Sequence, residues 1–444
     1  MRKKLMLLGA PALAIACLSS LTACGKHYDL VIYNWEDYIY LGTEDNGKIT
    51  DDSIVEKFVA YYAETHDGEQ ISVAYETFST NEEMYKQIKN KSIKADLICP
   101  SDYMIQKMAN EGRLEAFSYN EEQDKYDASL KNWDDFGSPF IRERFANEKL
   151  KDGSSFLKYA VPYFWGTMGF TYDPNYFSAE EISTWEALWS NDARFNKQFS
   201  IKDSVRDTYV TAIFHVYKDE IAALDINASD YNAKLSEIFN RCDDETIKKV
   251  ETALKQIKDS TVYGLEVDEG KDDIVRGVYH ANLAWSGDSV FSMDSAEEAG
   301  KTLNYALPVE GSNVWFDGWC MPKGANKELA EEFVNFISRP DNAALCMDEV
   351  GYTSPIVGED IWDMINEWYA ADEGETDVYE VDLSFYFGDT IEGDAKISIP
   401  NENKGRQFDA QYPTEDMLKR CCIMKDFGDQ QTKVEEMWNR VAIG

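Results

Sequence analysis

Short apolar runs alternate with amphipathic stretches from about residue 30 onward. Segments 30–33, 71–78 and 96–99 have the length and apolar content of strands. Segments 53–63, 81–91 and 103–110 repeat their apolar positions with helical spacing, and the second follows an N-capping residue. This strand–helix order predicts an α/β fold with a mostly parallel sheet flanked by helices on both faces.

A second α/β region follows in the middle of the chain. Its pattern predicts a strand at 168–172, a helix from Asp243 or Asp244 to about Lys258, and a strand at 281–285. A further helix over 327–338 has one apolar face and ends before Pro340. Segment 371–395 is rich in Asp and Glu and predicts an acidic surface excursion, whose role stays open.

The carboxyl ends of the predicted strands are the places to look for a ligand, because ligands of open α/β sheets bind there. This rule selects the loops 34–38 and 100–103. Aromatic side chains stand beside acidic ones at these and two other predicted strand ends: Trp35 with Tyr38, Tyr103 with Asp102, Trp285 with Asp288, and Trp315 with Asp317. Aromatic faces and carboxylates together favour a desolvated organic cation.

The N-terminus has the pattern of a lipoprotein signal. A basic start is followed by an apolar run over 5–21 and by Leu-Thr-Ala before Cys24. The run is too short to span a membrane comfortably. We therefore expect residues 1–23 to be a signal peptide and Cys24 to carry lipid, on the outer face of the cytoplasmic membrane or in a periplasm. The envelope type stays open.

Net charge narrows the classes of partner. The 444 residues contain 82 acidic and 44 basic side chains, which gives −38 at pH 7. Such a chain is a poor partner for nucleic acid and attracts cations. The six cysteines beyond Cys24 show no metal-ligand spacing and the four histidines are scattered, so we expect no metal and no cofactor. Whether Cys421 and Cys422 pair stays open.

The sequence contains neither the GxSxG motif nor the HExxH motif. Instead, five runs in the same order resemble the spermidine/putrescine-binding proteins of ABC transporters. They are YNWEDY at 33–38, PSDY at 100–103, PYFWGT at 162–167, WFD at 315–317 and GYTSP at 351–355. The resemblance extends from about residue 28 to 355 and returns weakly in the last thirty residues.

The resemblance implies a periplasmic-binding-protein-like fold of two lobes that close on a ligand in the cleft between them about a hinge. Lobe 1 would hold 28–165 and about 312–400, and lobe 2 about 166–311 and about 401–444. The implied ligand-binding residues are Trp35, Tyr38, Ser101, Tyr103, Ser204, Asp207, Trp285, Trp315, Asp317 and Tyr352. Trp285 would pack on the carbon chain of the ligand, Trp315 would lie near the hinge, Asp317 would pair with an amine, and Tyr352 would close one wall.

Two positions depart from the family pattern. Ser204 stands where the best-known spermidine binders have the first of two carboxylates, although Asp203 lies beside it. Near the C-terminus the chain has Met424 and Lys425 where the family often presents a glutamine. The choice between putrescine and spermidine therefore stays open.

The leading hypothesis is a monomeric, lipid-anchored, non-enzymatic protein that captures a polyamine and delivers it to a membrane permease driven by an ATPase. One alternative is a binding protein for another small solute, such as a sugar or an amino-acid derivative. A more distant alternative is a secreted glycoside-acting enzyme that uses two of the many carboxylates.

Overall fold

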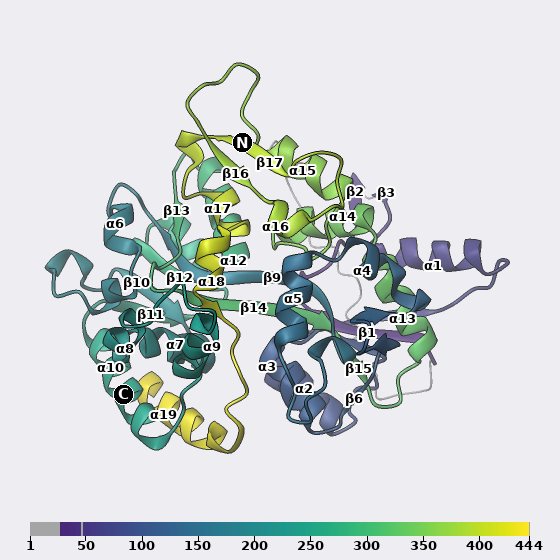
Figure 1. Cartoon of the computed structure of the whole chain (residues 1–444), viewed down its shortest axis with the longest axis horizontal. Coiled ribbons are helices and arrows are strands. Elements are labelled where there is room, and N and C mark those ends of the chain that lie inside the picture. Colours follow the sequence, from purple (N-terminus) through teal and green to yellow (C-terminus); the bar gives the residue numbers. More distant parts are fainter. Residues whose placement is uncertain (1–26, 46–47, 444) are drawn as a thin grey trace.

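The computed structural model describes residues 27–45 and 48–443, so Cys24 and the expected signal peptide lie outside the described residues. Figure 1 shows two lobes joined by long strands. One lobe contains a parallel sheet of order β4-β1-β5. Its strands are β1 (Leu30–Trp35), β4 (Val73–Phe78) and β5 (Leu97–Ile98), and its first helices are α1 (Ile54–Thr65), α2 (Asn81–Lys89) and α3 (Asp102–Asn110).

Local sequence signals explain these first helices. Ser53 and Glu56 form a capping box at the start of α1, and the Thr80 hydroxyl accepts a hydrogen bond from the Glu83 N–H at the start of α2. All three predicted helices and all three predicted strands of this lobe are present, and their ends lie within a few residues of the expected ones.

The other lobe contains a mixed sheet of order β11-β10-β12-β9-β14-β18, with β13 paired to β9. The strands are β9 (Val161–Tyr172), β10 (Phe199–Lys202), β11 (Val262–Glu266), β12 (Ala281–Trp285), β13 (Asn304–Ala306), β14 (Ser312–Trp319) and β18 (Cys421–Cys422). β10, β11 and β12 are parallel, whereas β9 runs antiparallel to β12 and β14. The helices are α6 (Ala179–Ile182), α7 (Val205–Val216), α8 (Lys218–Ala222), α9 (Tyr231–Phe239), α10 (Asp244–Asp259), α11 (Glu269–Arg276), α12 (Ser286–Glu298) and α19 (Gln431–Ile443).

β9 links the two hydrophobic cores. Every residue of this strand is buried. Tyr163 and Trp165 belong to the core that surrounds β1, whereas Met168 and Phe170 belong to the core that surrounds β10. Figure 1 shows β9 and β14 passing side by side between the lobes.

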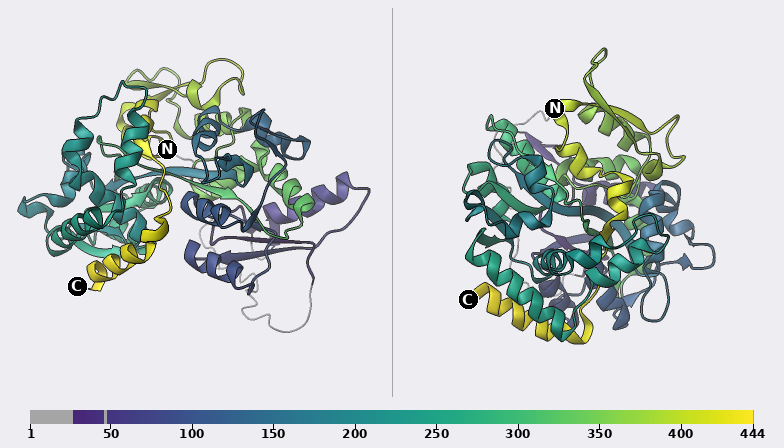
Figure 2. Two further views of the ribbon diagram at one scale, coloured as in Figure 1. Left: turned by 60° about the horizontal axis from the view of Figure 1, so that its bottom comes forward. Right: turned by 60° about the vertical axis from the view of Figure 1, so that its left-hand side comes forward.

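The remaining elements complete both lobes. In Figure 2, α19 lies against α10 at one end of the molecule in both views. The other helices are α4 (Lys131–Phe136), α5 (Pro139–Asn147), α13 (Lys327–Ile337), α14 (Pro340–Val350), α15 (Glu359–Tyr369), α16 (Ser384–Phe387), α17 (Gln407–Gln411) and α18 (Glu415–Lys419). The paired short strands are β2 (Thr43–Asp45) with β3 (Lys48–Asp51), β6 (Leu114–Glu115) with β15 (Met321–Pro322), β7 (Tyr119–Asn120) with β8 (Lys125–Tyr126), and β16 (Val378–Asp382) with β17 (Lys396–Pro400).

The acidic segment 371–395 is only partly a surface excursion. Its acids are exposed or half-exposed, but Tyr386 and Phe387 are buried in the core of the first lobe. The Tyr386 hydroxyl accepts a 2.8 Å hydrogen bond from the Trp165 indole N–H. The predicted acidic surface excursion is therefore correct for the acids but not for the short apolar runs between them, which pack into the core.

The six cysteines of the described residues form no disulfide, and Cys421 and Cys422 are both buried thiols. Within residues 27–45 and 48–443, no helix combines the length and apolar character that a membrane crossing requires.

Candidate functional site

The two loops selected from the sequence meet at β14. Ser101 precedes α3 and forms an antiparallel bridge with Asp317, which lies in the middle of β14. Tyr38 follows β1 and reaches the same aspartate. The carboxyl end of the first sheet and the strand that links the lobes thus provide one cluster of polar side chains.

Asp317 is buried, with 6% of its surface exposed. The Tyr38 hydroxyl donates a 2.6 Å hydrogen bond to Oδ2, whereas Oδ1 has no partner among the described residues. Burial raises the pKa of Asp317 to about 6, and hydrogen bonds from Tyr38 and Ser101 oppose that rise. A buried carboxylate with one free oxygen is suited to an added cation.

Asp207 is the second buried carboxylate of the site and comes from the other lobe. It lies in the first turn of α7, where the Trp285 indole N–H donates a 3.2 Å hydrogen bond to Oδ1. Burial raises its pKa, and hydrogen bonds from Ser204 and Trp285 act against this rise, as do the charges of Lys202 and Arg206.

Ser204 caps α7, and its hydroxyl accepts a hydrogen bond from the Asp207 N–H. Its neighbour Asp203 is exposed, and the Asp203 N–H bonds the Glu266 carbonyl. Asp203 therefore does not take the place of the missing carboxylate.

Tyr352 joins the two lobes. Its hydroxyl donates a 2.8 Å hydrogen bond to Asp288 Oδ1, and its ring meets the rings of Tyr38 and Trp315 edge-on. The ring also lies directly on Gly287, where a Cβ atom would be 2.1 Å from the nearest ring carbon. Glycine at 287 therefore permits this close approach.

In the described part of the chain, the other predicted aromatics form hydrogen bonds with other residues or are buried without one. The Trp35 indole N–H donates to the Cys99 carbonyl at 2.8 Å, and the Tyr103 hydroxyl donates to Glu82 at 3.0 Å. Trp315 is buried, and its indole N–H has no hydrogen-bond partner among the described residues. Trp35, Tyr103 and Trp285 are half-buried, and Trp285 contacts the buried carboxylate of Asp207.

Two basic residues of the site were missed by sequence reasoning. Lys202 is 2% exposed and donates from Nζ to Asp288 Oδ2 and to the Val267 carbonyl, both at 3.0 Å. Arg206 lies between the rings of Tyr103 and Phe427, at 4.4 and 4.2 Å from their centroids. The available signal was two basic residues four positions apart, beside Asp207 in an acidic chain.

The charges of the cluster favour a cationic ligand. Its buried acids are Asp102, Asp207, Asp288 and Asp317, and its buried bases are Lys202 and Arg206. Burial raises the pKa of Asp102 well above its usual range, and the Arg206 charge opposes that rise. Burial thus favours the neutral form of Asp102, and the two bases face three other acids, whose excess charge a ligand cation would compensate. In the part of the chain that the structure describes, no group of three His, Cys, Asp or Glu side chains is arranged to hold a metal ion.

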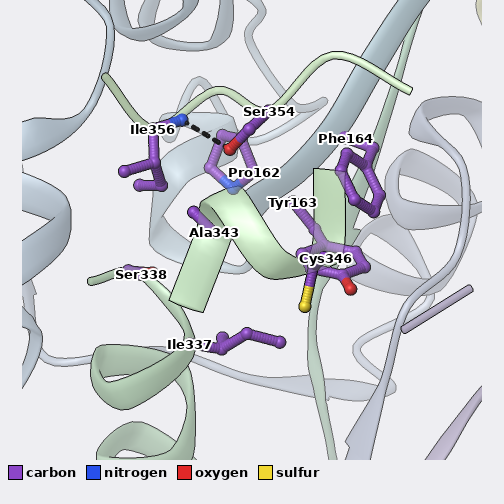
Figure 3. A pocket seen from close by; sticks show the side chains of 9 residues that line it. All are labelled: Pro162, Tyr163, Phe164, Ile337, Ser338, Ala343, Cys346, Ser354 and Ile356. Atoms are coloured by element: carbon purple, nitrogen blue, oxygen red, sulfur yellow. Dashed lines mark hydrogen bonds between the residues drawn. The ribbon is translucent and has the colours of Figure 1, made fainter. Parts of the chain in front are cut away.

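A small cavity lies behind this site, inside the first lobe (Figure 3). It has about 10 Å³ of space, enough for about one water molecule. Tyr163 connects it to the site, because its hydroxyl donates a 2.9 Å hydrogen bond to the Tyr38 carbonyl. The lining residues are Pro162, Tyr163, Phe164, Ile337, Ser338, Ala343, Cys346, Ser354 and Ile356. The cavity is too small for an organic solute.

Comparison with known proteins gives one family match over most of the chain. Residues 57–371 match the bacterial extracellular solute-binding proteins. A spermidine/putrescine-binding periplasmic protein of Salmonella typhimurium is 26% identical over 352 residues, which cover 79% of this chain and 83% of the relative. A putrescine-binding periplasmic protein of Escherichia coli is 24% identical over 362 residues, covering 79% and 84%.

Solved structures share the fold. A putative spermidine/putrescine ABC transporter protein from Listeria monocytogenes superposes with a TM-score of 0.61 at 23% identity, covering 93% of this chain and 98% of its own. A lipoprotein of Treponema pallidum superposes with a TM-score of 0.62 at 18% identity, covering 94% and 99%. The expected two-lobed α/β binding-protein fold is confirmed.

Proposed function

Because this chain belongs to the bacterial extracellular solute-binding proteins, which bind solutes for transport and are not enzymes, we propose that its solute is a polyamine. The protein captures the amine between its lobes and delivers it to the permease of an ABC importer. One observation carries the proposal: each lobe contributes a buried carboxylate, Asp207 or Asp317, that accepts a hydrogen bond from an aromatic side chain.

The proposed roles follow from the contacts. Asp317 and Asp207 pair with two ammonium groups, since each carboxylate lies where its charge is poorly solvated. Trp285, Trp35, Tyr103 and Trp315 pack on the methylene carbons between the charges. Tyr352 closes one wall, and Ser101 and Ser204 orient the two acids. The named activities of the relatives from Salmonella typhimurium and Escherichia coli support this choice of ligand.

Delivery requires a change between open and closed lobes, and a ligand that contacts both lobes stabilises the closed state. We propose that the chain crossings near residues 165 and 310 form the hinge. The lobes would then comprise 28–165 with about 312–400 and 166–311 with about 401–444. The protein would act as a monomer held at the membrane by lipid on Cys24, with the permease and its ATPase as partners.

Calorimetric titration of the purified protein, produced without residues 1–23, with putrescine, spermidine and spermine tests the identity of the ligand. Saturable binding of at least one amine supports the proposal, and no heat with any of them overturns it. Glucose and maltose serve as neutral comparison solutes. Asp317→Asn and Asp207→Asn must each weaken amine binding, whereas a sugar site would tolerate both changes.

A further inference from the structure

Lys202 is a buried cation in a position that the proposed function does not use. It ends β10, and its side chain extends toward α12 and β12 of the same lobe. Its Nζ lies 3.7 Å from the centre of the Trp285 ring while it bonds Asp288 and the Val267 carbonyl. A carboxylate, a carbonyl and an indole face are the contacts that a bound ammonium group would make.

We propose that Lys202 is a specificity-determining residue that supplies one ammonium group from the chain itself and so restricts the site to short diamines. The proposal rests on the polyamine function argued above. With Lys202 in place, Asp288 is already paired, and one face of Trp285 is covered by a positive charge. Asp207 and Asp317 remain for the two ends of a diamine. Burial raises the pKa of Asp102, the fourth buried acid of the cluster, well above its usual range, so this acid is poorly suited to hold the third ammonium of a triamine.

The arrangement around Asp288 fixes the lysine. One oxygen of Asp288 accepts from Lys202 and the other accepts from Tyr352, so both are engaged. The Val267 carbonyl holds the ammonium from another side. A ligand ammonium could reach Asp288 only by displacing one of these partners, and displacement of Lys202 would leave a buried charge unpaired.

Trp285 places this internal cation close to the proposed ligand. Its ring face contacts Lys202, while its N–H bonds Asp207. The Lys202 charge also acts on Asp207, where it opposes the rise in pKa that burial causes. A third ligand ammonium near Trp285 would therefore meet a like charge across one ring.

The test is the ratio of spermidine affinity to putrescine affinity, measured by calorimetry at pH 7.5. The wild-type protein is expected to prefer putrescine. Lys202→Met frees Asp288, and we expect the ratio to rise by about tenfold, as one charge-assisted bond is gained. Lys202→Met combined with Asp288→Asn removes the freed carboxylate and should return the ratio to the wild-type value.

Lys197→Met is the matched control. Lys197 precedes the same strand and donates to the Lys258 and Val262 carbonyls, away from the site. Its replacement should leave the ratio unchanged. If Lys202→Met does not fold, as judged by thermal unfolding, Lys202→Leu also removes both the charge and the hydrogen-bond donors, and the same expectation applies.

The outcomes separate the two proposals. A wild-type protein that gives no heat with putrescine, spermidine or spermine overturns the proposed function, and one that binds spermine alone overturns the role of Lys202. A wild-type protein that binds both putrescine and spermidine but prefers spermidine, or a charge-removing variant whose ratio stays within twofold of the wild-type value, overturns the role of Lys202 and leaves the polyamine function intact.

Discussion

The hydroxyl of Tyr38 donates a 2.6 Å hydrogen bond to Asp317, 279 positions later in the chain. This bond joins the loop after the first strand to the strand that links the lobes. Among residues 27–45 and 48–443, the other carboxylate oxygen of this buried aspartate has no hydrogen-bond partner. Asp317 is thus held in position for a charge that the protein itself does not supply.

Asp317→Asn should weaken amine binding and stabilise the ligand-free protein. Loss of one charge-assisted bond weakens binding by about 1.5–3 kcal/mol. The pKa of Asp317 is about 6 in the folded state against 3.8 as the ordinary value, so at pH 7 the buried charge costs up to about 3 kcal/mol. Asparagine removes that cost and can still accept the Tyr38 bond.

Calorimetry and urea unfolding at pH 7 measure the two effects. Asp409→Asn is the control, because Asp409 is another carboxylate with a burial-raised pKa, bonded by Tyr379 away from the site. It should leave amine affinity unchanged. An Asp317→Asn variant that binds as tightly as the wild type would remove Asp317 from the site.

The raised pKa of Asp317 also predicts how stability depends on pH. Between pH 3.8 and about 6 the folded state holds this proton more tightly than the unfolded state. The contribution of this group to the free energy of unfolding is therefore greatest below pH 4, falls as pH rises through this window, and is lowest above pH 6. The free energy of unfolding is measured at each pH for the wild type and for Asp317→Asn, and the difference between the two isolates this contribution. A difference that does not change with pH would contradict the burial argument.

Amine binding should weaken as pH falls from 7 to 5. The amines keep their charge in this range, whereas Asp317 gains a proton near pH 6 and loses its attraction for an ammonium. The logarithm of the binding constant measured across this range should fall, and the fall should be smaller in Asp317→Asn. Equal slopes in both proteins would assign the pH dependence to another group.

Gly287→Ala should weaken binding by more than about tenfold. The added Cβ would overlap the Tyr352 ring, so the ring must move and its bond to Asp288 is lost. Gly264→Ala is a matched control, since its Cβ would meet only one side-chain atom at an ordinary contact distance. If both variants bind the amine equally well, the position of Tyr352 does not matter for the ligand.

Ser204→Asp should increase affinity for the more highly charged amines. Aspartate is as good an N-cap as serine, so α7 should keep its stability to within about 0.5 kcal/mol. The new carboxylate adds negative charge beside Asp207 and reproduces the acidic pair of the family pattern. Titration with spermidine and spermine measures the gain, and unchanged affinity for both would show that residue 204 does not face the ligand.

The sequence was sufficient for elements whose signals are local. The helix after Ser53 is predicted by its capping residue and helical spacing, and the strand 281–285 by its short apolar run. Each of these signals lies within a few consecutive residues. Lys202 was missed because its partner Asp288 is 86 positions away, and no periodicity reports such a pairing. Tyr386 was missed for the same reason, since its partner Trp165 lies 221 positions earlier in the chain.

β9 has a consequence for how the protein unfolds. Its first half fills one hydrophobic core and its second half fills the other, and all twelve residues are buried. If one core melts, β9 loses half of its packing and the surviving core loses the continuity of its central strand. Heating should therefore produce one cooperative transition in differential scanning calorimetry, with equal calorimetric and van't Hoff enthalpies, although the molecule has two lobes. The strand that links the lobes thus also couples the unfolding of one lobe to that of the other.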